Sequence, residues 1–245
     1  MSDDEFHDQI KWAARLEHVR EVSLLGTADL SYWMRQLEPE ELFPVDYDGQ
    51  AQIMIVGADS KFMGVPFREI SFSVLVEPPD NRFGREAAYL IQAFNSSRFF
   101  AFCERTFFST PYSYGGTMVS ASHPVSIKLS GIAGGLFDAQ QQAVQREPLR
   151  CGDDGWEGPI YLPVKHRTGN RQGKLFFACI RGETKTYGFQ RSQDRMTLTP
   201  AACTPVLQAL HDSNFAPQQW AIRNDATHAK SKTYRRTAAS RKSEG

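Results

Sequence analysis

Two charged residues occupy positions in predicted strands where the side chain must point to one definite face. Arg20 lies within the apolar segment 19–25, and Glu69 directly precedes the apolar segment 70–76. On the inner face of a barrel, a charged side chain without a partner carries a large desolvation cost. A buried arginine and a buried glutamate would therefore pair with each other or bind a ligand. From the residues alone, structural pairing or surface exposure is the favoured interpretation.

The motifs of the common enzyme classes are absent. The sequence contains no GxSxG nucleophile elbow, no HExxH zinc motif, no phosphate-binding loop and no GxGxxG dinucleotide motif. The cysteines are far apart, with no CxxC and no histidine at metal spacing; they are Cys103, Cys151, Cys179 and Cys203. This pattern indicates neither a zinc site nor a disulfide framework, and we expect no cofactor.

Apolar periodicity predicts the elements that position these residues. In the first half of the chain the predicted strands cover residues 19–25, 51–56, 70–76 and 87–94. The predicted helices cover residues 4–18, 28–37 and about 96–108. In strand 70–76, alternation places Phe72 and Val74 on one face and Ser71 and Ser73 on the other. In the third helix, we expect Phe99 and Phe107 to be core residues.

The second half of the chain is typical of antiparallel β structure. The candidate strands are 117–122, 125–129, 136–142, 159–164, 174–181, 184–189 and 195–198. A helix is predicted from Pro200 to about residue 211, followed by one apolar anchor at 220–222. The chain then becomes basic and polar. We expect a single domain over residues 1–236 and a disordered basic tail over 237–245.

The composition narrows the class of protein. The chain has 245 residues, 41% of them hydrophobic, which is enough for a sizeable core. Lysine plus arginine and aspartate plus glutamate both number 28, so overall charge gives no reason to expect a nucleic acid or an acidic membrane as partner. No apolar run approaches the roughly 18 residues of a membrane helix, and no signal pattern opens the chain. We expect a cytoplasmic protein with reduced thiols.

The order and spacing of several short motifs resemble the acetoacetate decarboxylase-like superfamily, which includes bacterial relatives of unknown function. Arg20-Glu21 opens a strand before a helix that is followed by Pro39, as in family members. Phe67-Arg68-Glu69 then leads into the strand Ser73-Val74-Leu75-Val76. A helix carrying Glu104-Arg105 ends in a Phe-x-x-Pro-Tyr sequence at Phe108–Tyr112. The match covers roughly residues 19–115.

The resemblance implies an α+β, mostly β fold. It would be a closed antiparallel β-barrel or cone with a ligand cavity inside and a few helices packed outside. In this family Arg20 would help to hold a substrate carboxylate, and Glu69 would be an acid or base in the cavity. The partner implied is a small molecule, and a homo-oligomer is compatible with the sequence.

The residue that carries the family's best-known reaction is not matched. The decarboxylase uses a lysine just after the proline, whose amine forms an imine with the substrate ketone. Tyr112 and Ser113 stand at the matching positions, and neither can form an imine. A second family carboxylate is also unmatched, because Met54 or Gln52 falls there. Lys61, Lys128 and Lys174 are alternative lysines that could reach the cavity from elsewhere.

Three hypotheses follow for function. The first is an enzyme with altered chemistry, without a Schiff-base lysine, on a small carboxylated or carbonyl substrate. In it Arg20 binds the anion, Glu69 acts as acid or base, Tyr112 donates a hydrogen bond and Ser113 contacts the substrate. The second is a non-catalytic barrel that binds an apolar molecule. The third gives the basic tail a role on nucleic acid or an anionic surface and ranks below both. A decarboxylase with a relocated lysine remains a further alternative.

Overall fold

The computed structural model describes residues 10–78, 87–132, 135–142, 146–164, 173–201 and 204–236, so the expected tail 237–245 lies outside the described residues. The long strands are β1 (Trp12–Asp29), β3 (Gln50–Phe62), β4 (Val65–Val76), β5 (Ala87–Asn95), β10 (Arg150–Leu162), β11 (Lys174–Gly188) and β13 (Ala216–Ser231). The shorter strands are β2 (Asp46–Tyr47), β6 (Tyr112–Tyr114), β7 (Gly116–Ser120), β8 (Val125–Ile132), β9 (Gly135–Gln141), β12 (Asp194–Thr199) and β14 (Tyr234–Arg235). Most of the described chain is therefore β structure.

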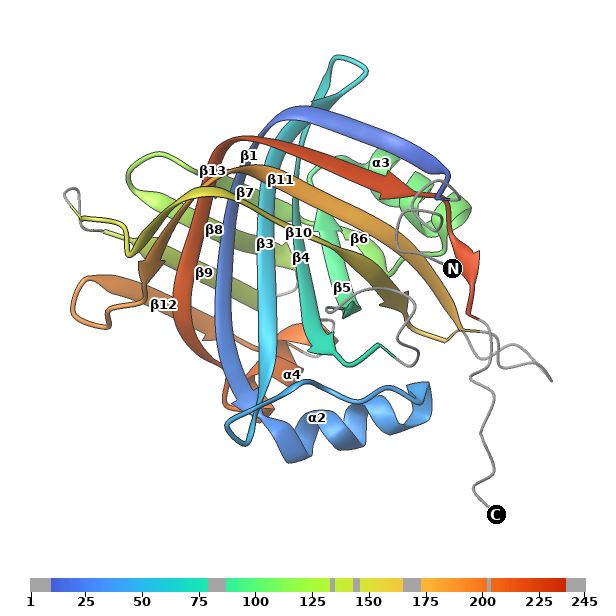
Figure 1. Cartoon of the computed structure of the whole chain (residues 1–245), viewed down its shortest axis with the longest axis horizontal. Coiled ribbons are helices and arrows are strands. Elements are labelled where there is room, and N and C mark those ends of the chain that lie inside the picture. Colours follow the sequence, from blue (N-terminus) through green and yellow to red (C-terminus); the bar gives the residue numbers. More distant parts are fainter. Residues whose placement is uncertain are drawn as a thin grey trace.

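The long strands pair around a ring (Figure 1). Their order is β1-β13-β11-β10-β5-β4-β3, and β3 pairs again with β1 from Arg20↔Asp59 to Asp29↔Gln50. The sheet is mixed, whereas the sequence led us to expect antiparallel pairing only. β5 pairs in parallel with β10 and with β6. β6 lies beside the last residues of β5, from Ala93↔Tyr112 to Asn95↔Tyr114, and the helical crossover between the two strands allows them to run in the same direction.

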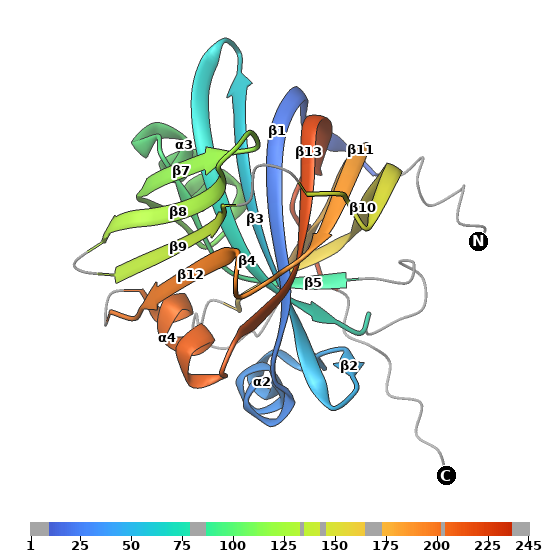
Figure 2. The same ribbon diagram turned by 90° about the vertical axis from the view of Figure 1, so that its left-hand side faces the viewer.

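A second sheet of four strands covers one outer side of the ring (Figure 2). Its order is β12-β9-β8-β7, and it packs over β1, β3 and β4. The main core lies between the two sheets, where the rings of Phe72 and Phe137 meet edge to face with centroids 5.6 Å apart. Gly57 allows close approach here, because a Cβ atom added to it would lie 3.0 Å from Val119 Cγ2.

The helices are short and lie outside the ring. They are α2 (Leu30–Leu37), α3 (Arg98–Cys103) and α4 (Pro205–Asp212), and two further turns follow α2 and α3: the 3-10 turn η1 (Glu38–Glu40) and the π-helical turn η3 (Glu104–Phe108). α2 begins after Asp29, whose carboxylate accepts a hydrogen bond from the backbone N–H of Tyr32 at 2.7 Å. Among the described residues, no helix has the length and apolar character needed to cross a membrane.

Alternation along β4 separates the core from the interior of the ring. Phe72 and Val74 are fully buried in the main core. Ser71 and Ser73 point the other way and line a cavity inside the ring. This confirms the two faces predicted for segment 70–76. Glu69 is two residues before Ser71, so its side chain lies on the same face as the two serines, toward the cavity.

Several predicted elements differ from the structure. The candidate strands 174–181 and 184–189 form one strand, β11. Of the helix predicted over residues 4–18, residues 4–9 lie outside the described residues, and residues 12–18 belong to β1 because they pair with β13, for example Ala14 with Lys230. The segment after the predicted anchor at 220–222 continues as β13 to Ser231, although its composition is polar. In these cases long-range pairing overrides a weak local preference.

Candidate functional site

A cavity of about 240 Å³ lies inside the ring and is the candidate site. Strands from the whole ring, together with α3 and η3, contribute to its wall. Much of the wall is aromatic or aliphatic. Its polar side chains include Glu69, Asn95, Glu104, Tyr112, His228 and Lys230. Apolar walls with a few convergent polar groups are characteristic of small-molecule sites.

Glu69 and Tyr112 form a hydrogen-bonded pair in the cavity. The phenol Oη of Tyr112 donates to Glu69 Oε2 over 3.2 Å. Burial raises the pKa of Glu69, and the nearby charge of Glu104 acts in the same direction, against smaller opposing effects of Lys230, His228 and the Tyr112 bond. Burial and the charge of Glu69 raise the pKa of Tyr112 well above its ordinary value. Tyr112 is therefore a hydrogen-bond donor, and Glu69 holds a proton more readily than a free glutamate.

Lys230 projects from β13 into the same cavity, with 18% of its side chain exposed. Its Nζ forms an ion pair with Glu104 Oε2. The same Nζ lies 4.6 Å from the ring centroid of Phe176, 4.8 Å from Phe108 and 5.6 Å from Tyr112. Carboxylates and aromatic faces both attract an ammonium group, so the amine is held at a defined place in the cavity.

Glu104 is positioned by the turn that carries it. It opens the π-helical turn η3, which ends at Ser109 in the left-handed conformation with φ of 61°. The hydroxyl of Thr110, which is fully buried, donates to Glu104 Oε2 over 2.8 Å. Single π-helical turns recur at functional sites because they re-aim side chains, and here the turn and Thr110 aim a carboxylate at Lys230.

A second charged cluster lies behind His228. Glu21 on β1 is fully buried; it binds Arg223, and its Oε2 lies 2.6 Å from Nε2 of His228. Burial acts to raise the pKa of Glu21, but the bond and charge of His228, the charge of Arg223 and the bond from Ser23 outweigh it. The pKa of Glu21 is lowered to about 2. Glu21 is therefore a carboxylate, and it fixes the orientation of a histidine that lines the cavity.

Of the residues expected at the site, the structure brings Glu69 and Tyr112 together but not the other two. Arg20 lies outside the cavity, 60% exposed, with its Nη2 2.5 Å from Asp59 Oδ2. Side chains alternate between the two faces of β1, and Arg20 is on the same face as Val22, which packs in the main core toward the second sheet. The neighbouring Glu21 therefore points to the inside of the ring, where Arg20 was expected. Ser113 is half-buried and is not part of the cavity wall. The expectation that Arg20 and Glu69 share one cavity is thus corrected.

The alternative lysines considered from the sequence are also elsewhere. Lys61 is exposed near the end of β3. Lys128 lies on the second sheet with its Nζ 3.6 Å from Asp138 Oδ2, and Lys174 donates to Ser109 Oγ over 2.8 Å. The cavity lysine is Lys230, which sequence reasoning assigned to a basic terminal stretch. Alternation from the 220–222 anchor would not have found it, because Trp220 packs in the main core and a register shift between Arg223 and Ala226 reverses the alternation before His228 and Lys230.

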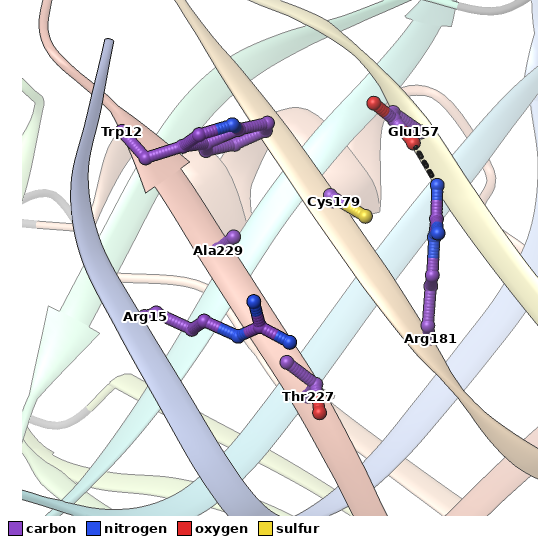
Figure 3. A pocket seen from close by; sticks show the side chains of 7 residues that line it. All are labelled: Trp12, Arg15, Glu157, Cys179, Arg181, Thr227 and Ala229. Carbon is purple, nitrogen blue, oxygen red and sulfur yellow. Dashed lines mark hydrogen bonds and ion pairs between the residues drawn. The ribbon is translucent and has the colours of Figure 1, made fainter.

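A shallow depression lies on the outer face of the ring (Figure 3). It contains Trp12, Arg15, Cys179 and Arg181, and Arg181 donates to Glu157 over 2.7 Å. Burial and the charge of Glu157 raise the pKa of the Cys179 thiol, which makes it a weak nucleophile. The inner cavity, where an amine, two carboxyl groups and a phenol converge, is the better candidate.

The comparison with solved structures identifies the fold. No model of a protein family matches the sequence, and no curated protein matches it. Among solved structures, an acetoacetate decarboxylase superimposes with a TM-score of 0.60 at 14% identity, covering 96% of this chain and 98% of the other.

Two further structures are similar. The acetoacetate decarboxylase of Legionella pneumophila gives a TM-score of 0.64 at 11% identity, covering 92% of this chain and 88% of that one. The enduracididine biosynthesis enzyme MppR, complexed with pyruvate, gives 0.59 at 11% identity, covering 93% and 91%. At these identities the likeness concerns the fold and not the chemistry. The chain has the fold of the acetoacetate decarboxylases and of the decarboxylase-like enzymes.

Proposed function

We propose that the protein is an enzyme that binds a small carbonyl compound in the ring cavity and joins it to Lys230 as an imine. The observation that carries this proposal is the amine of Lys230 inside the cavity, beside Glu104 and the Glu69–Tyr112 pair. Because Tyr112 and Ser113 occupy the position of the family lysine, imine chemistry was not our first expectation. Lys230 supplies an amine from a different strand.

The residues present can balance each step of imine formation. Glu104 takes a proton from the ammonium of Lys230, and the free Nζ then attacks the carbonyl carbon to form a C–N bond. The carbonyl oxygen becomes a hydroxyl by accepting a proton from Glu69, with Tyr112 as a hydrogen-bond donor. The nitrogen then gives one of its two protons to Glu69, the hydroxyl takes the proton that Glu104 holds and leaves as water, and the freed nitrogen lone pair forms the C=N bond.

The iminium formed in this way draws electrons from the neighbouring carbon. Removal of a proton there, by the carboxylate form of Glu69 or by Glu104, leaves the electron pair in an enamine. Carbon dioxide leaves by the same route when that neighbouring carbon carries a carboxylate. The site thus supports both proton exchange and decarboxylation at the carbon next to the carbonyl.

Borohydride trapping tests the proposal. The protein is incubated separately with acetoacetate, pyruvate and 5-oxohexanoate, reduced with borohydride, and analysed by intact mass and peptide mapping. We expect a covalent adduct on Lys230 in the wild type and none in Lys230→Met. Lys232→Met is the matched control, since Lys232 is exposed two residues further along the chain and should leave the adduct unchanged. Absence of an adduct with every carbonyl compound would overturn the proposal.

A second function is favoured by the aromatic wall. Phe67, Phe100, Trp156 and Phe176 line the cavity, and such a surface binds apolar molecules without any reaction. In that case Lys230→Met would retain ligand binding, and no exchange of protons next to the carbonyl would occur in deuterated water. NMR of the ligand therefore separates the two functions.

A further inference from the structure

Trp156 brings an unpaired hydrogen-bond donor to the cavity. In the described part of the chain, several buried polar side-chain atoms lack a hydrogen-bond partner. Of the residues that carry these atoms, Trp156 lines the cavity, and its unpaired atom is the indole Nε1. The indole packs against the interior cluster that includes Tyr112 and Phe176. An indole N–H can only donate, and leaving it buried without an acceptor is unfavourable. A bound acceptor oxygen would remove this cost.

His228 lies in the same row of the ring. Trp156 of β10 pairs with Ile180 of β11, and Ile180 pairs with His228 of β13. All three residues line the cavity. Neighbouring strands are about 4.8 Å apart, so the backbones of Trp156 and His228 are separated by roughly 10 Å, with both side chains directed inward. Their polar groups can converge on one acceptor group between them.

His228 offers a second hydrogen-bonding group to the cavity. Its Nε2 lies 2.6 Å from Glu21 Oε2, and its ring lines the cavity. The carboxylate of Glu21 is offset by the guanidinium of Arg223, with which it forms an ion pair. A bound carboxylate would accept hydrogen bonds from the indole N–H of Trp156 and from Nδ1–H of His228.

The amine of Lys230 lies away from this row. Lys230 is two residues beyond His228, which is roughly 7 Å along the strand. Its Nζ leans further from His228, toward Phe176, which stands opposite Ile160 one row beyond Ala178. The amine and the Trp156–His228 row are thus separated by roughly 7 to 13 Å, and the cavity residue next to the row on β11 is the apolar Ala178.

We infer that Trp156 and His228 form a carboxylate subsite, and that the substrate is an oxo acid whose ketone and carboxylate are separated by a chain of several methylenes. This inference rests on the proposed imine at Lys230. In acetoacetate a single methylene separates the two groups, so that molecule cannot reach both ends of the cavity. For the longer acid the carboxylate anchors the substrate and is not lost, and the enamine undergoes proton exchange.

The test compares trapping rates along a series of oxo acids. Acetoacetate, levulinate, 5-oxohexanoate and 7-oxooctanoate are reduced onto the protein with borohydride, beside the methyl ester of each acid. We expect the trapping rate of the wild type to rise with chain length for the acids, at least tenfold from acetoacetate to the best acid, and to change little for the esters. Trp156→Phe keeps the ring but removes the donor, and should abolish the preference for acid over ester. Trp12→Phe, on the outer face, is the matched control.

A second measurement separates failure of this inference from failure of the imine. Lys230→Met cannot form an imine, so its binding of hexanoate, measured by calorimetry, tests the subsite alone. Binding that weakens at least tenfold on addition of Trp156→Phe or His228→Gln supports the subsite even if no carbonyl compound is ever trapped. Two results would overturn the subsite. One is an acid-to-ester ratio of trapping rates that is the same in the wild type and in Trp156→Phe. The other is hexanoate binding that neither substitution changes.

Discussion

Lys230 and Glu104 are 126 residues apart in the chain and form an ion pair inside the cavity. One comes from β13 and the other from the π-helical turn η3, so the pair depends on the ring being assembled. Both side chains are largely shielded, with exposures of 18% and 21%. Such shielding makes each partner depend on the other, since neither charge is well solvated.

Replacement of Glu104 by glutamine should therefore destabilise the protein. The ammonium of Lys230 would keep its aromatic neighbours but lose its counter-ion, and we expect a loss of about 1–3 kcal/mol in the free energy of unfolding. Urea denaturation of Glu104→Gln, Lys230→Met and the double variant gives the coupling energy. The surface pair Arg150–Asp154, whose side chains are 68% and 40% exposed, is the control and should show almost no coupling. Equal coupling in the two pairs would contradict the expectation.

Glu21 should make stability depend on acid pH. Its pKa is lowered from 4.5 to about 2 in the folded chain. The unfolded state thus binds the proton more tightly, so the stabilisation is complete above about pH 4.5 and is lost as the pH falls toward 2. A depression of this size corresponds to about 3 kcal/mol. Denaturation of Glu21→Gln from pH 3 to 7 should show that loss at pH 7 and a flatter pH dependence.

Glu17→Gln is the comparison for this prediction. Glu17 lies on the same strand, but its side chain is 65% exposed and lies 3.9 Å from Arg15. Removing an exposed carboxylate of this kind should change stability by less than about 1 kcal/mol at any pH. If Glu17→Gln and Glu21→Gln gave parallel pH curves, the buried cluster would not be the source of the acid sensitivity.

Glu69 should behave in the opposite way. Burial raises its pKa, so the folded chain favours the protonated carboxyl group. Its stabilising contribution is present below the ordinary value of 4.5 and declines as the pH rises through the folded pKa. Glu69→Gln, which keeps a neutral polar group, should therefore gain stability relative to the wild type as the pH increases above 4.5. Thermal unfolding between pH 4 and 8 measures this gain, and a loss that grows with pH would rule out a raised pKa.

The sequence predicted best where alternation coincides with burial. Segment 70–76 was assigned the correct two faces because Phe72 and Val74 are large and apolar while Ser71 and Ser73 are small and polar. Glu69 and Tyr112 were selected as candidates, and they contact each other in the cavity. The resemblance to the decarboxylase-like superfamily agrees with the fold of the solved structures.

The main failure in the strands has a physical cause, which is that partner strands decide structure where local preference is weak. Lys230 belongs to a polar, basic segment that becomes a strand only because β1 and β11 flank it on both sides. Arg20 was placed at the site by the family resemblance, whereas the residues alone favoured structural pairing or exposure, and Arg20 is indeed exposed and paired with Asp59. Phe99 and Phe107 were expected in the core but are 67% and 70% exposed, and Phe107 lies in the π-helical turn Glu104–Phe108, where helical periodicity no longer holds.

Gly57 offers a test of how closely the second sheet packs on the ring. A Cβ atom there would lie 3.0 Å from Val119 Cγ2 and 3.3 Å from the side chain of Ile127, which is closer than ordinary contact. Gly57→Val should therefore destabilise the protein by about 1–3 kcal/mol through overpacking, and the added substitution Val119→Ala should restore part of the loss by freeing that space. Gly152→Ala on β10 is the control, since no atom lies within 4 Å of its added Cβ. Urea denaturation of the wild type, Gly57→Val, the double variant and Gly152→Ala measures these effects. Unaltered stability in Gly57→Val would mean that the two sheets separate easily. The tight contact between β3 and the second sheet would then not stabilise this side of the ring.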